Sequence, residues 1–239
     1  MPVLGGGLVL AMRDGLWRFD LASGQRTRLA LPPYDPAVQR FNDGKADAQG
    51  RVWVGTLHEP KDRPAAALYR WAHGEIECMA EGITTSNGLA WSPDGRTLYW
   101  SDTQAHCIYA LDVDAQEGSL TRRRVFQQFP LKTPDQDLDQ YGGRPDGAAV
   151  DAEGCYWVAM FEGQCLLRLT PDGAIDRRVM LPVRCPTMPC FGGPDLRTLY
   201  VTTARHKRPA SELARMPWSG CVLQMRVEVP GLPTNFAVL

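Results

Sequence analysis

Three short segments of the sequence place oxygen-bearing side chains in the same local context. Each holds Asn or Asp with a nearby Gly, shortly before a strand-like run, and the segments are Arg40-Phe-Asn-Asp-Gly-Lys45, Ser86-Asn-Gly-Leu89 and Arg144-Pro-Asp-Gly147. Asn42, Asn87 and Asp146 would supply two amides and one carboxylate, an oxygen-only set that suits hard divalent cations such as Ca²⁺ or Mg²⁺. Taken singly, Asn-Gly and Asp-Gly are also ordinary turn dipeptides. Their recurrence at equivalent places favours a shared site.

Other catalytic chemistries find less support. The sequence has no Gly-x-Ser-x-Gly elbow and no Gly-rich loop that ends in Lys-Ser or Lys-Thr. Its four histidines are scattered without metal-ligand spacing, which argues against a zinc site held by nitrogen. Cys185 and Cys190 enclose two prolines, so their segment is predicted to be a loop and not a redox pair.

The elements that position these side chains form a repeat. An acidic turn followed by an apolar, aromatic strand recurs, and its marker aromatics, 46, 58 and 43 residues apart, are Trp53, Tyr99, Trp157 and Tyr200. A second strand that alternates apolar and polar residues follows each marker, as in a hairpin. Helical periodicity is limited to a short candidate at residues 210–216. Hairpins at this period predict an all-β fold, a β-propeller, and the alternative is a β-sandwich or a stack of unrelated hairpins. The aromatics predicted to pack between blades are Trp53, Trp91, Trp100, Trp157 and Tyr200.

Composition describes an ordinary globular chain. Lys plus Arg total 26 and Asp plus Glu total 27 in 239 residues, and the net charge of −1 gives no general footprint for nucleic acid or anionic lipid. No apolar stretch approaches the ~20 residues that span a bilayer, and the first residues lack a basic n-region, so neither a membrane span nor a secretory signal is expected. Seven cysteines without a Cys-x-x-Cys pair predict reduced thiols and a cytoplasmic protein.

The motifs resemble those of the gluconolactonase family, also called the SMP-30/regucalcin family. The resemblance rests on segments 40–56, 86–92, 144–149 and 190–205, and it covers nearly the whole chain. It implies a six-bladed propeller with one divalent metal ion in its central channel and hydrolysis of sugar lactones to aldonic acids. At roughly 50 residues per blade a six-bladed chain needs ~300 residues. Residues 1–239 are therefore predicted to form one propeller domain with about five blades, incomplete at its N-terminus.

The resemblance also implies a set of metal ligands. Asn87 and Asp146 resemble protein ligands of the ion, and Asn42 lies near it. The ion itself is Ca²⁺, Zn²⁺, Mg²⁺ or Mn²⁺. The family's further ligand is a glutamate in a Glu-Gly-Pro motif, which this sequence lacks. Because carboxylate charge largely sets the affinity for a hard cation, weak metal retention and low activity are expected of this chain.

The substrate-binding and catalytic roles follow from the same resemblance. Asp146 resembles the catalytic acid/base, and Arg40 and Asn42 resemble the pair that holds the substrate's oxygens. Residues 58–64 are similar to the loop that covers the substrate, and Glu59 is the nearest match there to a carboxylate that touches the sugar. The register of Glu59 is set less firmly than that of the strand residues.

The predicted function is therefore metal-dependent hydrolysis of a small-molecule sugar lactone, with no nucleic-acid or membrane partner. The alternatives are a non-catalytic, calcium-binding regulatory propeller and an inactive fragment. Arg40 and Asn42 favour catalysis, because a pure binding scaffold needs no pair of residues to hold substrate oxygens. The sequence makes no prediction about the particular lactone or the oligomeric state.

Overall fold

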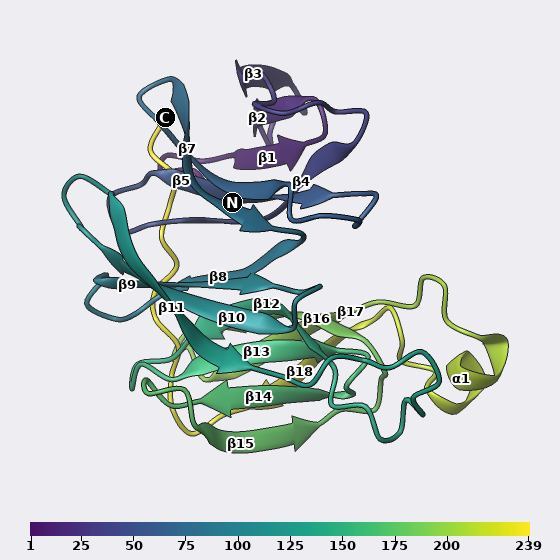
Figure 1. Ribbon diagram of the computed structural model, residues 1–239. Coiled ribbons are helices and arrows are strands. Elements are labelled where there is room, and N and C mark those ends of the chain that lie inside the picture. Colours follow the sequence, from purple (N-terminus) through teal and green to yellow (C-terminus); the bar gives the residue numbers. More distant parts are fainter.

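The computed structural model describes all 239 residues. The chain forms eighteen strands and one short helix, and the strands lie in five antiparallel sheets (Figure 1). Within each sheet, consecutive strands pair in chain order, so each sheet is one meander. The predictions of an all-β fold and of five propeller blades are confirmed. The sixth blade and the single-domain boundary stay predictions.

The sheets follow one another along the chain. The first contains β1 (Leu8–Met12), β2 (Gly15–Phe19) and β3 (Arg26–Ala30). The second contains β4 (Gln39–Ala46), β5 (Val52–His58), β6 (Ala66–Ala72) and β7 (Glu75–Ile83). The third contains β8 (Ser86–Trp91), β9 (Thr97–Asp102), β10 (Cys107–Val113) and β11 (Leu120–Gln128). The fourth contains β12 (Arg144–Val150), β13 (Tyr156–Phe161), β14 (Cys165–Leu169) and β15 (Ile175–Met180).

The fifth sheet contains β16 (Pro186–Gly192), β17 (Thr198–Thr203) and β18 (Val222–Arg226). The only helix, α1 (Ala210–Arg215), lies between β17 and β18, within the predicted range, and is far too short to cross a membrane. The Cys185–Cys190 segment was expected to be a loop, and this prediction is wrong because it forms most of β16. Strand β16 pairs only with β17, so its prolines remove no hydrogen bond from a second neighbour.

The repeated acidic turn has a common hydrogen-bonding arrangement. Asp47 accepts backbone N–H bonds with one carboxylate oxygen, and its other oxygen accepts from the Trp53 indole at 2.8 Å. Asp151 does the same two sheets later, where the Trp157 indole also lies 2.8 Å from its carboxylate. The aromatic marker of the repeat is therefore tied to the acidic residue that opens it, which explains why the two recur together.

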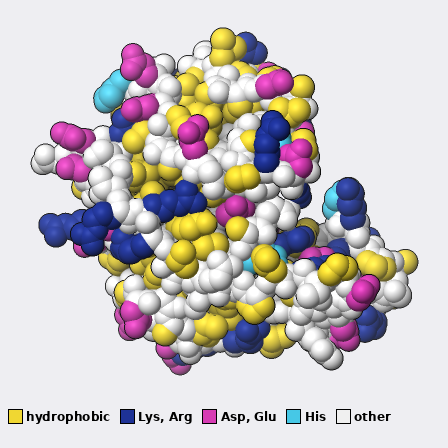
Figure 2. Space-filling view, viewed as in Figure 1, with side chains coloured by type: hydrophobic (Ala, Val, Ile, Leu, Met, Phe, Trp, Pro, Cys, Tyr) yellow, Lys and Arg dark blue, Asp and Glu magenta, His cyan; other side chains and the backbone are white.

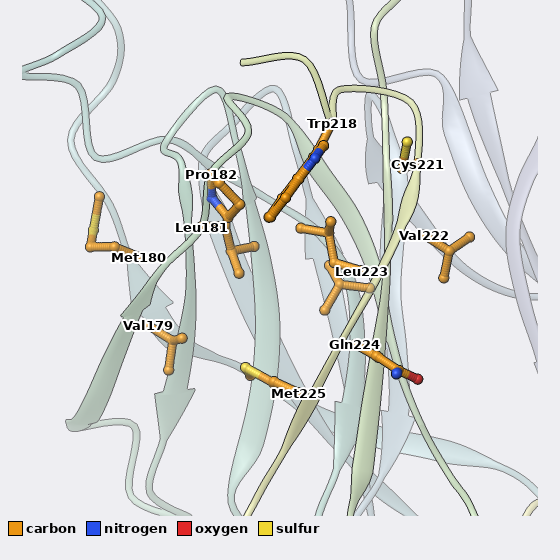
Figure 3. Close-up of a pocket in the computed structure, with 11 residues that line it drawn as sticks. Val179, Met180, Leu181, Pro182, Trp218, Cys221, Val222, Leu223, Gln224 and Met225 are labelled. Carbon is orange, nitrogen blue, oxygen red and sulfur yellow. The ribbon is translucent and has the colours of Figure 1, made fainter. Parts of the chain in front are cut away.

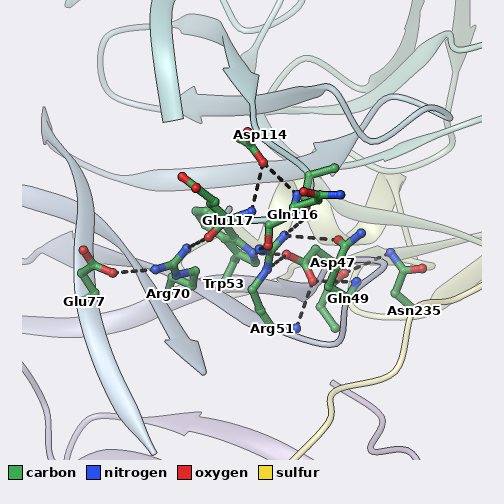
Figure 4. A network of polar contacts seen from close by, with 12 residues as sticks. Asp47, Gln49, Arg51, Trp53, Arg70, Glu77, Asp114, Gln116, Glu117 and Asn235 are labelled. Carbon is green, nitrogen blue, oxygen red and sulfur yellow. Dashed lines mark hydrogen bonds and ion pairs between the residues drawn. The ribbon is translucent and has the colours of Figure 1, made fainter. Parts of the chain in front are cut away.

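One such turn also joins its sheet to the next one (Figure 4). Arg51 bonds to Asp47 at 2.6 Å through Nε, and its terminal nitrogens donate to the carbonyls of Ala115 and Gln116 at 3.0 Å. Arg70, on the neighbouring strand β6, donates to the Glu117 carbonyl. Two arginines of the second sheet thus hold the β10–β11 turn of the third sheet.

Hydrophobic clusters fill the spaces between successive sheets. Four clusters lie between the first and second, second and third, third and fourth, and fourth and fifth sheets. Four of the aromatics predicted to pack between blades are buried in these clusters, namely Trp53, Trp91, Trp100 and Trp157. The same prediction is wrong for Tyr200, which is 38% exposed. Its neighbours on β17 pack against the fourth sheet, and no further sheet covers the opposite face of that strand.

The C-terminal segment crosses the turn ends of several sheets to reach the first residues of the chain (Figure 1). Gly231 pairs with Asp151 of the fourth sheet, and Val238 donates from its backbone nitrogen to the Gly50 carbonyl at 2.9 Å. Ala237 then pairs in parallel with Val3. This segment links the fourth sheet, the second sheet and the N-terminal residues at one end of the molecule.

Candidate functional site

The three sequence motifs lie inside strands and not in turns. Asn42 lies in β4, Asn87 in β8 and Asp146 in β12, the first strands of three successive sheets, which contact one another side by side. Each strand has a register shift next to that residue. Such bulges redirect side chains that regular pairing would place on the sheet faces. The turn interpretation of the Asn-Gly and Asp-Gly pairs is therefore wrong.

The glycine of the second motif is required by both conformation and space. Gly88 has a φ of 64°, a left-handed value that favours glycine. A Cβ atom at this position would collide with the Tyr156 hydroxyl, which donates a hydrogen bond to the Gly88 carbonyl at 2.7 Å. The bulge beside Asn87 thus depends on glycine and is held by a tyrosine of the next sheet.

A chain of hydrogen bonds connects the three strands. Asn42 donates from Nδ2 to Asn87 Oδ1 at 2.8 Å, and Asn87 donates from Nδ2 to Thr103 Oγ1 at 2.8 Å. Thr103 in turn donates to the carbonyl of Pro145, at 2.7 Å, immediately before Asp146. The structure therefore brings Asn42, Asn87 and the strand segment of Asp146 together, as the sequence predicted. Thr103 was not predicted, because a single Thr after a strand has no distinctive sequence signal.

Arg40 lies beside this group. Its Nη1 donates to Asn42 Oδ1 at 3.0 Å and to the carbonyl of Phe41 at 2.9 Å. Glu59, directly after β5, has one carboxylate oxygen 3.7 Å from Arg40 Nε. Arg13 donates to both Glu59 oxygens, at 2.8 and 2.9 Å, and these bonds lower the pKa of the Glu59 carboxyl. Glu59 thus lies at the site next to Arg40, but an arginine from the first sheet already holds it.

Two carboxyl groups lie close together at the centre of the site. The pKa of Asp146 is raised to about 8, mainly by burial and in part by the nearby charge of Asp43, while Arg144 opposes the shift. Burial also raises the pKa of Asp43, against the charge of Lys45 and a 2.9 Å hydrogen bond from the Leu89 backbone nitrogen. No side chain donates a hydrogen bond to Asp146. Its negative charge is therefore poorly compensated by the protein.

A second glutamate, Glu162, occupies the position in the fourth sheet that Glu59 occupies in the second sheet. Glu162 directly follows β13 and is 8% exposed. It accepts from Lys132 Nζ at 3.1 Å and Arg208 Nη1 at 2.9 Å, and Arg144 Nη2 lies 3.4 Å away. Burial by itself would raise the pKa of Glu162, but these cations lower it below its ordinary value. The position of Glu59 in the repeat could have indicated Glu162, but its three cations come from segments that no motif marks.

The oxygen atoms of this group fit a hard divalent cation. Asp146 supplies a half-buried carboxylate whose charge needs a positive partner, and Asn87 and Asn42 supply amide oxygens. The structure has no cluster of three His, Cys, Asp or Glu side chains. Asn87 Oδ1 already accepts from Asn42, so a cation there would use its second lone pair or require the Asn42 amide to turn.

A large cavity lies elsewhere in the molecule. It measures about 540 Å³ between β15 and β18, and Val179, Leu181 and Leu223 are among its mostly apolar lining residues (Figure 3). Trp218 extends over it in this view. Its lining is mostly apolar and has no charged side chain, whereas acid/base chemistry needs titratable groups, so the strand ends near Asp146 are the better candidate site.

The fold and these side chains define a β-propeller with an oxygen-rich site on its inner strands. Residues 1–205 match the family described as SMP-30/Gluconolactonase/LRE-like region, and the chain belongs to this family. The family resemblance of the sequence motifs is thereby confirmed.

Individual relatives cover most of the chain. It is 46% identical over 229 residues to 6-deoxy-6-sulfogluconolactonase from Pseudomonas putida, which covers 95% of this chain and 75% of the relative. It is 35% identical over 244 residues to regucalcin from Xenopus laevis, covering 97% and 78%. The structure of a calcium-binding protein, regucalcin, from Agrobacterium tumefaciens strain C58 matches with a TM-score of 0.89 and 29% identity, covering 100% and 78%. These similarities support a lactone hydrolase.

Proposed function

We propose that this protein hydrolyses a sugar lactone with the help of one divalent cation held by Asp146, Asn87 and Asn42. The observation that carries the proposal is the chain of hydrogen bonds that joins Asn42, Asn87 and the backbone directly before Asp146 on three bulged inner strands, with Arg40 bonded to Asn42. Its support from relatives is the 46% identity to 6-deoxy-6-sulfogluconolactonase.

The protein's own groups supply the proton transfers. Asp146 takes a proton from the water that attacks the lactone carbonyl carbon, and it returns this proton to the ring oxygen as the ester bond breaks. The product is the aldonic acid. Arg40 stays protonated and donates to substrate hydroxyls or to the oxygen that becomes negative during attack. A divalent cation bound at this site polarises the carbonyl and makes water more acidic.

The cation also determines the protonation state of Asp146. Without a cation, a pKa of about 8 leaves this carboxyl largely protonated near neutral pH, where it cannot act as a base. A positive charge among the oxygens favours the carboxylate, so catalysis by Asp146 is expected to depend on the ion. Calcium, magnesium, manganese and zinc are all candidates, because oxygen ligands select among them only loosely.

Base uptake at constant pH tests the proposal. The EDTA-treated protein is mixed with a panel of sugar lactones, first alone and then with Ca²⁺, Mg²⁺, Mn²⁺ or Zn²⁺. The panel includes a sulfonated gluconolactone, because the Pseudomonas putida relative is a 6-deoxy-6-sulfogluconolactonase. Turnover that appears only with an ion, is lost in Asp146→Asn and is kept in Asp94→Asn supports the proposal. Asp94 is the matched control because it caps an exposed turn through Ser92 and Arg96.

The second candidate is a calcium-binding regulator, favoured by the structural similarity to the calcium-binding regucalcin. Calorimetry of Ca²⁺ binding separates the two. Tight binding without turnover of any lactone supports the regulator. Binding weaker than micromolar with measurable turnover supports the hydrolase and agrees with the low carboxylate content of the site.

A further inference from the structure

A second cavity lies at the same end of the molecule as the candidate site. It measures about 370 Å³, and the β9–β10 loop and the segment before β12 form its walls. Gln104, Lys132, Thr133 and Arg144 supply polar atoms to its lining. The lining is polar and basic, in contrast to the apolar cavity between β15 and β18.

Positive charge exceeds negative charge around this cavity. Lys132 and Arg144 both lie against the same oxygen of Glu162, at 3.1 and 3.4 Å. Glu162 also accepts from Arg208, but Arg208 has a second carboxylate partner, Glu212, at 2.5 Å. One carboxylate therefore serves two cations, whose side chains are 30% and 23% exposed and within reach of a small ligand. Their remaining N–H donors make no other hydrogen bond within the protein.

The cavity wall is held in place by a neutral histidine. His106 donates from Nδ1 to the Pro130 carbonyl at 2.7 Å, and its Nε2 therefore accepts from the Tyr141 hydroxyl at 3.1 Å. Burial lowers the pKa of His106, which keeps this tautomer at neutral pH. Lys132 lies over the Tyr141 ring, 5.4 Å from its centroid. The segment that carries Lys132 is thus anchored before any ligand arrives.

The cavity is also placed at the right distance from Asp146. Arg144 precedes Asp146 by two residues on β12, so their backbone positions lie no more than about 7 Å apart. A lactone whose carbonyl lies at Asp146 can therefore extend its far end toward Arg144. On the face drawn in Figure 2, Lys and Arg side chains border the hollow between the body and the lobe that carries α1.

A further lysine adds to the positive charge at this end. Burial lowers the pKa of Lys61, and the charges of Arg144, Arg40 and Lys207 lower it further, so these cations lie within electrostatic range of one another. Such an excess is unfavourable without an anion and unnecessary for a neutral sugar hydroxyl.

We propose that Lys132 and Arg144 bind a tetrahedral oxyanion, a sulfonate or a phosphate, at the end of the lactone opposite its carbonyl. The proposal rests on the lactonase function proposed above and names the substrate class. A tetrahedral oxyanion has three terminal oxygens, enough to accept from both cations and from Thr133 or Gln104. Lys132 and Arg144 would thus distinguish anionic lactones from neutral ones.

Kinetics with matched lactones test this assignment. The wild-type protein, Lys132→Gln, Lys132→Arg and Arg122→Gln are assayed with gluconolactone, its 6-phosphate and its 6-sulfonate. We expect Lys132→Gln to lower kcat/KM about tenfold on the anionic lactones, mainly through KM, with less than about a twofold change on gluconolactone. Lys132→Arg should retain most of the preference. Arg122→Gln removes the same charge from an exposed position on β11 and should change neither substrate.

The outcomes separate this proposal from the proposed function. Equal losses on neutral and anionic lactones, or no loss on either, overturn the oxyanion site while leaving the lactonase intact. A preference for one anionic lactone identifies the group as sulfonate or phosphate. If no lactone is hydrolysed, the lactonase fails, and calorimetry with the open-chain 6-phospho and 6-sulfo acids decides the site alone. Binding that is lost in Lys132→Gln supports the site, and no binding overturns it.

Discussion

Strands β4 and β12 carry the same local pattern but form different surroundings. Each places an arginine, Arg40 or Arg144, two residues before Asn42 or Asp146. Each arginine faces a glutamate that directly follows the neighbouring strand, at 3.7 Å for Glu59 and 3.4 Å for Glu162.

The two glutamates differ in their partners and burial. Glu59, with a side chain 36% exposed, is held by both nitrogens of Arg13. Glu162, 10% exposed by the same measure, is shared by three cations. Each carboxylate has one cation in excess, because Arg208 at Glu162 also pairs with Glu212. The two cations left at Glu162, Lys132 and Arg144, are more buried than Arg13 and Arg40 at Glu59. One repeated pattern can therefore provide a site for substrate oxygens in one sheet and a site for an anion in another.

The largest expected effect separates Asp146 from its equivalent, Asn42. Asp146→Asn removes the proposed acid/base, so turnover should fall about a thousandfold. Asn42→Ala removes an amide that Arg40 and Asn87 already contact, and a smaller loss is expected. Titration of lactone hydrolysis measures both. Equal losses would contradict distinct roles for the two positions.

The next effect distinguishes the two arginines. Arg40→Gln removes a donor to the reacting end of every lactone, and kcat should fall about a hundredfold on neutral and anionic substrates alike. Arg144→Gln should act mainly on KM for anionic lactones. The measurement is the loss of kcat/KM in each variant on neutral and on anionic lactones. An equal loss on both kinds of lactone in both variants would contradict different roles for Arg40 and Arg144.

The glutamates should differ in stability. Glu162→Gln leaves Lys132 and Arg144 without their shared carboxylate in a largely buried setting, so unfolding free energy should fall by about 3 kcal/mol. Glu59→Gln breaks a more exposed pair that water screens, so a smaller loss is expected. Urea unfolding of both variants compares them directly. A larger loss at Glu59 would show that burial does not set the difference.

The smallest effect concerns pH and the metal-free protein. The pKa of Asp146, about 8 in the folded state, exceeds the roughly 3.9 of an unfolded aspartate. The folded protein therefore binds more protons between these values, and its stability falls as pH rises through this window. Asp146→Asn removes this dependence. The Tm of the variant should therefore exceed that of the wild-type protein only slightly at pH 5 and by a few °C at pH 8. Thermal unfolding in EDTA measures it, and an advantage that shrinks with pH would contradict the assignment.

Much of the site could be predicted from the sequence because it lies in repeated strands. Asn42, Asn87 and Asp146 occupy equivalent places, so their convergence followed from the repeat. The position of Glu162 could be inferred from that of Glu59, but Lys132 and Arg208 could not be found this way. Lys132 contacts Glu162 across 30 residues of sequence, and Arg208 contacts it across 46. No periodic pattern predicts such pairings. The bulge that places the Asn-Gly pair within a strand could not be predicted either, because a bulge is defined by the register between paired strands.

The C-terminal segment has a consequence for the order in which the protein folds. The pairing of Val3 with Ala237 closes a loop that includes almost the whole chain. Contacts of such high sequence separation are slow to form, because chain entropy must be lost before they contribute. The meander sheets can form from local contacts, but Ala237 can pack against the first sheet only in the last step of folding. Refolding should therefore finish with this closure, and a kinetic intermediate should have its sheets formed and its C-terminal segment still free.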